Sequence, residues 1–213
     1  MLKKLTAKQQ ECILEAAVEV FGKNGYASAG ISEIAKKSNV SVGVIYKYYA
    51  DKDALFGACI DFCLELLGET LSSVAKQGGS ISDLARNLIH ANQSFSHTYP
   101  EYIKMYHAIT MGNGPQDASE LAIRIEKEVA QIYTTILTEA KENGEIRDDI
   151  DPGKFAFFFD NLMMLLHFSY CCDYYKERMR LYCGVDATQI KDDKRIEDEL
   201  MKFIEGALGI NEG

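Results

Sequence analysis

Residues 30–52 read GISEIAKKSNVSVGVIYKYYADK, and this stretch predicts two short helices that meet at a tight turn. ISEIAKK reads as the first helix and VGVIYKYY as the second, which Ser41 begins as a good N-cap. The intervening SNV is polar, and Asn39 tolerates a left-handed conformation there. Two helices joined in this way form a helix-turn-helix, which can place the start of its second helix in the major groove of DNA.

The side chains of this stretch suit contact with DNA. Val40 and Ile45 are apolar and are expected to hold the second helix against the first. The outer side then carries hydroxyls and a cation for phosphates, and two valines for base edges. A short basic arm at the N-terminus and a lysine just past the second helix can reach further phosphates. The candidate DNA-contacting residues, in and around the motif from Gly30 to Tyr49, are Lys4, Ser41, Val42, Gly43, Val44, Tyr46, Lys47, Tyr48 and Lys52.

The charge of the chain is divided unevenly. The net charge is -9. Residues 1–52 nevertheless hold eight lysines and five acids, a net of +3, which leaves -12 for residues 53–213. A basic head on an acidic body orients the head toward a polyanion. The alternative is that both charges only keep the surface soluble.

The rest of the chain predicts an all-α protein of about nine helices. It has 213 residues, three prolines and few strand-like alternations. We expect a three-helix DNA-binding head at 1–52 and a larger helical body for effector binding and dimerisation at 53–213. Outside the helix-turn-helix, helices are expected at about 7–23, 52–76, 82–97, 100–111, 117–143, 152–179 and 196–208.

No signal peptide is recognisable, and the most apolar stretch, 155–172, contains Asp160, Asn161 and His167. A membrane span would not place such side chains in lipid without a partner. We therefore expect a cytoplasmic protein with no membrane partner and no cofactor.

The residue types of the helix-turn-helix, and their spacing, resemble the signature of a known family. Ile34-Ala35, Val40-Ser41-x-Gly43-x-Ile45-Tyr46-x-Tyr48-Tyr49 and Lys52-Asp53-x-Leu55 are similar to the signature of tetracycline-repressor (TetR) family transcriptional regulators, as is Phe21-x-x-x-Gly25-Tyr26 upstream. The resemblance covers about residues 6–67. It departs from the usual pattern at Gly30, where Ser or Thr normally caps, at Tyr49, which replaces Phe, and at Val42 and Val44, which occupy positions that are often polar.

The resemblance implies a homodimeric repressor that binds a palindromic operator and is released by a small effector. The effector pocket implied for the body has aromatic and Met walls. Its candidate residues are Phe62, Leu66, Tyr106, Met111, Tyr133, Asp160, Met164, His167 and Phe168. Because no Lys or Arg lies between Lys154 and Lys176, we expect a hydrophobic effector that is neutral or cationic. The alternative is that these residues form an ordinary core.

The helix expected at 152–179 is apolar over most of its circumference and must be covered on several sides. We assign one strip of it, together with part of the last helix, to a partner subunit, and the resemblance agrees. The candidate interface residues are Phe158, Leu162, Leu165, Leu166, Ser169, Leu200, Phe203 and Ile204. The alternative is that both helices belong to the core of a monomer.

The sequence offers limited support for two other functions. A thiol or metal sensor on the same frame would use His167 with Cys171, Cys172 and Cys183, but the ligand set is incomplete. An enzyme is not expected, because the chain lacks a phosphate loop, a dinucleotide glycine cluster, a zinc-protease helix and a nucleophile elbow.

Overall fold

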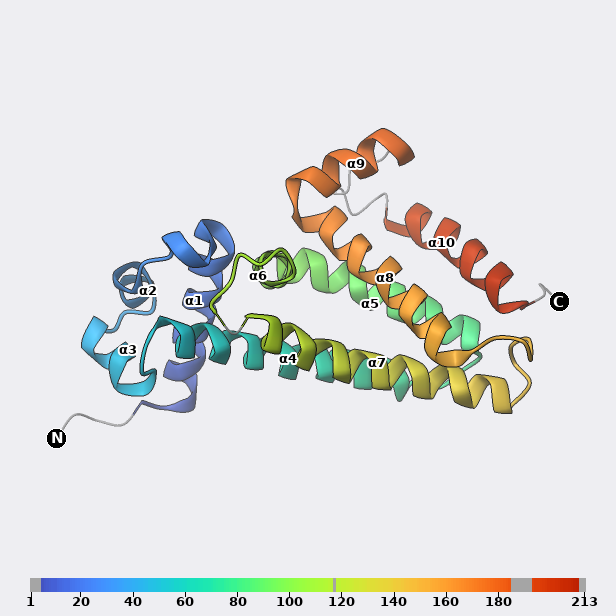
Figure 1. Cartoon of the computed structure of the whole chain (residues 1–213), viewed down its shortest axis with the longest axis horizontal. Helices are drawn as coiled ribbons and strands as arrows, with labels where there is room; N and C mark the ends of the chain where they lie inside the picture. Colours follow the sequence, from blue (N-terminus) through green and yellow to red (C-terminus); the bar gives the residue numbers. More distant parts are fainter. Residues whose placement is uncertain (1–4, 117, 185–192, 211–213) are drawn as a thin grey trace. The chain divides into compact units, whose positions relative to one another are not determined.

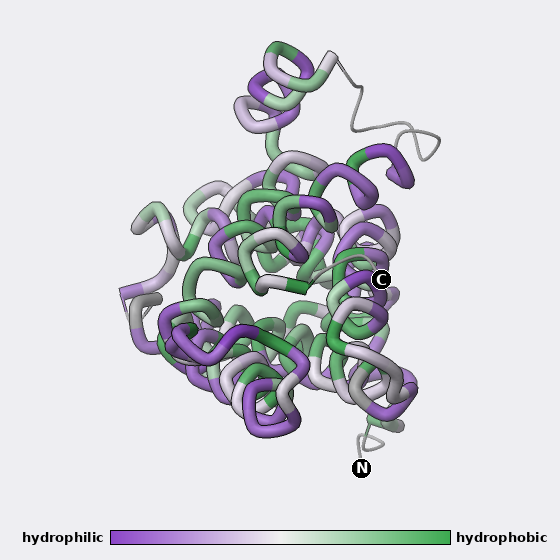
Figure 2. Tube along the Cα trace, turned by 90° about the vertical axis from the view of Figure 1, so that its right-hand side faces the viewer, coloured by the Kyte–Doolittle hydropathy of each residue, from purple (hydrophilic) through white to green (hydrophobic). Residues whose placement is uncertain are grey.

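The computed structural model describes residues 5–116, 118–184 and 193–210. Over these ranges the chain is all α-helical, as predicted (Figure 1). The ten helices in them are α1 (Ala7–Ser28), α2 (Ile31–Lys37), α3 (Val42–Tyr48), α4 (Lys52–Ala75), α5 (Ile81–Thr98), α6 (Pro100–Thr110), α7 (Ala118–Glu142), α8 (Pro152–Cys171), α9 (Asp173–Cys183) and α10 (Asp193–Leu208). Figure 2 shows hydrophobic and hydrophilic residues alternating along these helices, as amphipathic packing requires.

The prediction of one helix over 152–179 is wrong, and this adds one helix to the expected number. α8 ends at Cys171, and the backbone of Cys172 is extended. The chain bends by 104° between α8 and α9. The Cys171 thiol contacts the Ser96 carbonyl at 3.5 Å, so α5 holds the end of α8. Within the described ranges no single helix is long and apolar enough to cross a membrane, and only α8 and α9 taken together reach that length and composition.

The chain divides into two compact units, and each is described by itself. The N-terminal unit is Met1–Leu67 with Tyr99–Ile123, and the C-terminal unit is Gly68–Thr98 with Arg124–Gly213. The N-terminal unit therefore contains α6 and most of α4 in addition to the predicted head. The boundary at residue 52 stays a prediction about function, because the packing units divide elsewhere.

The N-terminal unit is organised around α1. Thr6 and Gln9 form the predicted capping box at its start. Gly25, with φ of 73°, interrupts the helix, but helical turns resume and continue to Ser28, beyond the predicted end at 23. Phe21 packs edge-to-face on Phe56 of α4, with ring centroids 5.0 Å apart. The buried apolar side chains that close this core are Ile13, Ala17, Ile34, Ala35, Ile45 and Leu55.

α6 packs against α1 at a glycine. A Cβ atom added to Gly22 would lie 2.7 Å from the backbone oxygen of Glu101. Only glycine lets the two backbones approach this closely. Glu101 also pairs with Lys104 one turn along α6, at 2.9 Å.

The C-terminal unit is built from the end of α4, α5, most of α7, and α8 to α10. Asp151 caps α8 as predicted, by accepting a hydrogen bond from the Lys154 N–H at 3.0 Å. Arg86 of α5 pairs with Glu197 of α10 at 2.8 Å, and Glu197 is buried. Met201, Ile204 and Leu208 of the same helix are also buried. Phe203 of α10, a candidate interface residue, is exposed.

Candidate DNA-binding surface and effector site

The turn between α2 and α3 is held by local hydrogen bonds. Asn39 has φ of 55°, the left-handed conformation expected of it. The Ser38 hydroxyl donates to the Ile34 carbonyl at 2.7 Å, and the Val40 N–H donates to the Ala35 carbonyl at 3.0 Å. The Ser41 hydroxyl then accepts from the Val44 N–H at 3.3 Å, which begins α3. These bonds hold the second helix of the motif at a defined angle to the first.

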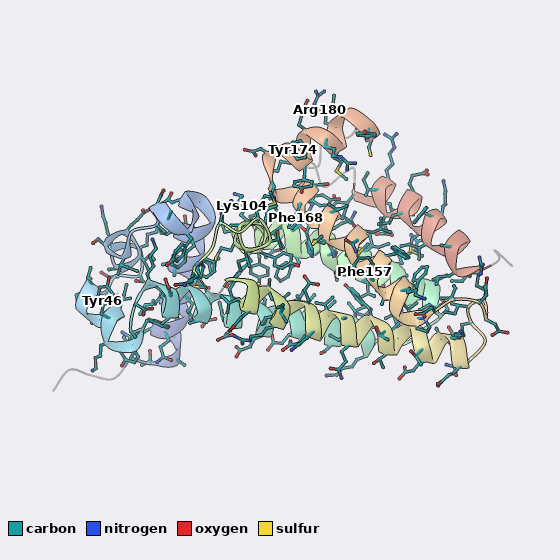
Figure 3. The ribbon with its side chains drawn as sticks, in the orientation of Figure 1. Tyr46, Lys104, Phe157, Phe168, Tyr174 and Arg180 are labelled. Atoms are coloured by element: carbon teal, nitrogen blue, oxygen red, sulfur yellow. The ribbon has the colours of Figure 1, made fainter. Side chains whose placement is uncertain are left out.

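α3 has one buried side and one open side. Ile45 is 1% exposed and holds the helix against the core. Ser41, Gly43, Tyr46 and Lys47 are exposed, and Val42, Val44 and Tyr48 are half-buried. Tyr46, at 49% exposed, lies on the outer side of α3 (Figure 3). This mixture of hydroxyl, cation and aliphatic groups forms the candidate DNA-binding surface.

Gly43 has a specific place on this surface. Its φ is not positive, and an added Cβ would meet only the Ser41 hydroxyl oxygen, at 3.9 Å. Alanine would stabilise an exposed helical position by about 0.5–1 kcal/mol relative to glycine. Within the described part of the chain nothing therefore requires glycine here, whereas close approach of another backbone, such as that of DNA, would.

Two of the predicted phosphate-binding groups already have contacts within the chain. The Lys52 ammonium donates to the Ala27 carbonyl at 3.2 Å and lies 4.7 Å from the centre of the Tyr26 ring. The Tyr48 hydroxyl accepts a hydrogen bond from the Leu5 N–H at 2.6 Å. Lys52 thus ties α4 to the end of α1, and Tyr48 ties α3 to the residue before α1. Lys4, the remaining candidate, lies outside the described residues.

The lysines of the head differ in their availability. Glu19 pairs with Lys23 at 2.6 Å and with Lys37 at 2.8 Å, and these hydrogen bonds lower the pKa of Glu19 to about 2. Lys47 is exposed, with its ammonium 5.7 Å from the centre of the Tyr48 ring. Lys36, which the sequence reasoning passed over, is exposed at the end of α2 and has no ion pair among the described residues. Lys36 and Lys47, like Lys8 near the start of α1, are exposed cations without an ion pair among the described residues.

The nine candidate effector residues divide between the two units. Phe62, Leu66, Tyr106 and Met111 belong to the N-terminal unit. Phe62 lies against Tyr102, with ring centroids 6.2 Å apart, while Met111 is 61% exposed at the end of α6. A single pocket that joins these residues to the other five stays a prediction.

The five candidates in the C-terminal unit are Tyr133, Asp160, Met164, His167 and Phe168. The Nδ1 atom of His167 lies 2.7 Å from the Ser96 hydroxyl, and burial lowers the pKa of His167 to about 3. The imidazole is therefore neutral at physiological pH. Phe168 is buried and packs on Tyr175 of α9, with ring centroids 5.4 Å apart.

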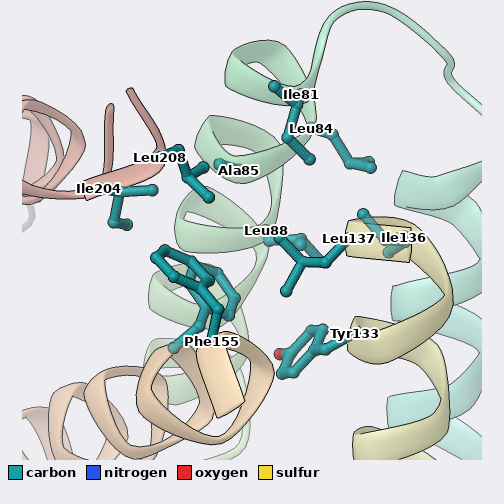
Figure 4. Close-up of a pocket in the computed structure, with 11 residues that line it drawn as sticks. Ile81, Leu84, Ala85, Leu88, Tyr133, Ile136, Leu137, Phe155, Ile204 and Leu208 are labelled. Carbon is teal, nitrogen blue, oxygen red and sulfur yellow. The ribbon is translucent and has the colours of Figure 1, made fainter. Parts of the chain in front are cut away.

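A small cavity lies between α5, α7, α8 and α10 in the C-terminal unit (Figure 4). Its volume is about 20 Å³. The side chains around it are hydrocarbon or aromatic, and they include Leu88, Tyr133, Leu137, Phe155, Phe159 and Ile204. Of the nine candidates, Tyr133 lines this cavity. Ile204 is also one of the candidate interface residues, and the rest of the lining is not among the candidates from the sequence.

The candidate interface residues differ in exposure. Phe158 and Phe203 are 63% and 62% exposed, and Leu165 is also exposed. Leu162, Ser169 and Leu200 are half-buried. Leu166 and Ile204 are buried by the chain's own helices, which leaves them little surface for a partner. Phe157, next to Phe158 and equally exposed, was missed because it falls outside the strip read from the sequence (Figure 3).

The thiols proposed for a sensor are in different surroundings. Cys171 is buried, Cys172 is half-buried and Cys183 is exposed. In the described part of the chain, no three His, Cys, Asp or Glu side chains gather closely enough to hold a metal ion. In the N-terminal unit, burial raises the pKa of the Cys59 thiol and raises that of Cys63 to about 12, which keeps both thiols protonated.

Comparison with known proteins gives the following matches. Residues 13–59 match the family model for bacterial regulatory proteins of the tetR family. YvdT of Bacillus subtilis, an uncharacterized HTH-type transcriptional regulator, is 38% identical over 71 residues, which are 33% of this chain and 35% of that protein. The chain thus spans well under two thirds of that relative. The fatty acid metabolism regulator protein of the same organism is 26% identical over 141 residues, 65% of this chain and 71% of that protein.

Among solved structures, the transcriptional regulator FadR from Bacillus subtilis in complex with stearoyl-CoA is similar, with a TM-score of 0.71 at 20% identity. The similarity covers 90% of this chain and 96% of that one. At this level of identity the comparison shows a shared fold.

Proposed function

Because the chain belongs to the TetR family of bacterial regulatory proteins, we propose that it is a transcription regulator that binds double-stranded DNA through α3. The observation that supports this most directly is the open side of α3, which Ile45 holds outward from the core. Ser41, Tyr46 and Lys47 supply phosphate contacts there. Val42 and Val44 supply apolar contacts to thymine methyl groups, so specificity at each base is modest and partly depends on DNA shape.

The regulator acts as a homodimer on a palindromic operator. Exposed Phe158 and Leu165 on α8 and Phe203 on α10 support this, because such large apolar side chains are usually covered in an assembly. A two-fold dimer presents two α3 helices to half-sites about one helical turn apart, ~34–36 Å, or a multiple of that distance. This symmetry is what makes the operator palindromic.

The C-terminal unit binds a small hydrophobic effector, and we infer that the effector releases the repressor from DNA. It must bind the conformation with low DNA affinity more tightly for this to happen. Two effector classes have support. The uncompensated carboxylate of Asp160 favours a neutral or cationic compound, whereas the stearoyl-CoA bound by FadR favours an acyl-CoA thioester.

Selection of bound sequences from a random DNA pool with the purified protein tests the DNA-binding proposal. We expect enrichment of a palindrome with thymine near the centre of each half-site. Enrichment of no sequence would contradict a specific regulator, and enrichment of an unsymmetrical site would contradict the dimer.

The effector class is tested by a thermal-shift screen with hydrophobic compounds of positive, zero and negative charge, including acyl-CoA thioesters. Compounds that stabilise the protein are then tested for release of the selected DNA. Stabilisation and release by acyl-CoA thioesters alone would rule out the neutral or cationic class.

A further inference from the structure

α9 carries more apolar side chains than its contact with α8 covers. On the covered side, Tyr175 lies against Phe168 of α8, with ring centroids 5.4 Å apart, and Met179 is buried. Three further side chains form what we call the α9 stripe: Tyr174, Leu181 and Tyr182, which are 73%, 68% and 80% exposed. Their positions are i, i+7 and i+8, so they share one side of the helix. Within the described part of the chain this stripe has no cover.

The surroundings of the α9 stripe suit a protein partner. Figures 1 and 2 show α9 projecting from the end of α8, beside the other helices of the C-terminal unit. Arg178 is exposed next to the stripe, with its guanidinium 5.2 Å from the centre of the Tyr182 ring. Tyrosine and arginine are enriched at protein–protein interfaces and among the residues that contribute most to binding there. The stripe therefore has the composition of an interface between proteins.

The candidate interface residues on α8 and α10 expose less apolar surface than a stable dimer needs. Phe158, Phe203 and Leu165 are 63%, 62% and 37% exposed, which at roughly 200 Å² for a large side chain is on the order of 300 Å². Half-buried Leu162 and Leu200 add a smaller area. A standard interface covers about 800 Å² on each partner, and in homodimers about 65% of it is apolar, or roughly 500 Å².

The α9 stripe supplies the missing area and adjoins the same surface. It exposes on the order of 400 Å² by the same measure. Of the ten large apolar side chains that are exposed among the described residues, three lie on α8, three on α9 and one on α10. α9 follows α8 after a single residue, so a partner seated on the outer side of α8 lies next to α9.

We propose that a second copy of this chain covers the α9 stripe, so that α9 belongs to the dimer interface together with α8 and α10. This inference rests on the proposed homodimer and extends its interface. It also accounts for α9 as an ordered element. A helix of 11 residues is marginal in water by itself and needs packing to hold it, which the partner supplies on the side that α8 leaves open.

Hydrogen exchange of the wild-type protein at several concentrations tests the proposal without any substitution. Sedimentation over the same range gives the dissociation constant of the dimer. At about ten times that constant, we expect the amides of α9 to exchange about tenfold more slowly than in the monomer. Exchange in α9 that is independent of concentration, while α8 or α10 becomes protected, would overturn the proposal. Sedimentation as a monomer at every concentration would contradict the homodimer itself, and this inference with it.

Two variants locate the contact. Leu181→Ser and Tyr182→Ser remove exposed apolar side chains, and each should weaken the dimer about tenfold or more in sedimentation, because the lost burial occurs in both copies. Circular dichroism checks that each variant keeps its helix content. Ile123→Ser is the matched control, because Ile123 is 52% exposed on α7 in the N-terminal unit, and it should dimerise as the wild type does. A dimer that Phe203→Asp disrupts but both α9 variants leave at wild-type affinity would confine the interface to α8 and α10.

Discussion

Replacing Gly22 with alanine tests whether α6 is seated directly on α1. In the N-terminal unit the added Cβ would lie 2.7 Å from the backbone oxygen of Glu101 and equally close to its Cβ. Ordinary contact begins near 3.4 Å, so α6 must retreat by about 0.7 Å. The obstruction includes backbone, and a change of side-chain rotamer cannot remove it.

Two opposing effects set the magnitude. Alanine in place of glycine inside a helix stabilises by about 0.5–1 kcal/mol. Overpacking a well-packed contact costs about 1–3 kcal/mol. Gly57→Ala is the matched control, because Gly57 is also helical, belongs to the same unit and has no atom within 4 Å of an added Cβ. The propensity gain is common to both variants, so the difference between them isolates the clash at about 1–3 kcal/mol.

Urea denaturation followed by circular dichroism measures both free energies of unfolding. We expect Gly57→Ala to be more stable than the wild type and Gly22→Ala to be less stable than Gly57→Ala by the stated difference. Should the two variants agree within about 0.5 kcal/mol, α6 does not approach α1 as closely as described, and the reasoning fails.

Four further outcomes are expected. Gly43→Ala should raise the free energy of unfolding by about 0.5–1 kcal/mol yet weaken operator binding; unchanged binding in a filter assay would show that DNA does not approach this glycine closely. Lys47→Ala should reduce the log–log salt slope of DNA binding by about one unit, and Lys127→Ala on α7 should not. Asp160→Asn should stabilise the protein by ~1–2 kcal/mol at neutral pH, because the pKa of Asp160 is about 6 in the folded protein against an ordinary 3.8, so that its ionisation opposes folding. The gain in the free energy of unfolding should vanish below about pH 3.8, where Asp160 is protonated in both states. A gain that persists there in denaturation curves would refute this cause. If the protein forms the proposed dimer, Phe203→Asp should turn it into a folded monomer in light scattering, and a surviving dimer would remove this residue from the interface.

Local chemistry was enough to predict the helix-turn-helix. α2 spans the residues expected, α3 ends one residue early, and Asn39 and Ser41 have their predicted conformation and capping role. The capping box of Thr6 and Gln9 at the start of α1 and the N-cap Asp151 of α8 were predicted in the same way. These features depend on residues within one turn of each other, so the sequence alone determines them. It also carries the resemblance to the TetR family, because the spaced matches lie within one short stretch, and residues 13–59 match that family's model.

Contacts between distant segments decided the rest. The sequence from Phe168 to Tyr174 contains no glycine or proline, so nothing local predicts that α8 ends at Cys171, where the thiol contacts the Ser96 carbonyl of α5. The sequence predicts that Lys52 binds phosphate, whereas the structure shows its ammonium in contact with the Ala27 carbonyl and the Tyr26 ring.

The candidate effector site depends on such contacts most of all. Tyr133 is recognisable in the sequence, but its position beside an apolar cavity, with its ring against Phe159, exists only once α7 packs against α8. Hydrophobic periodicity shows which side of a helix is buried, and it carries no information about which other helix covers that side. That choice is made when the whole core packs, and it is why the helices could be read from the sequence while the site could not.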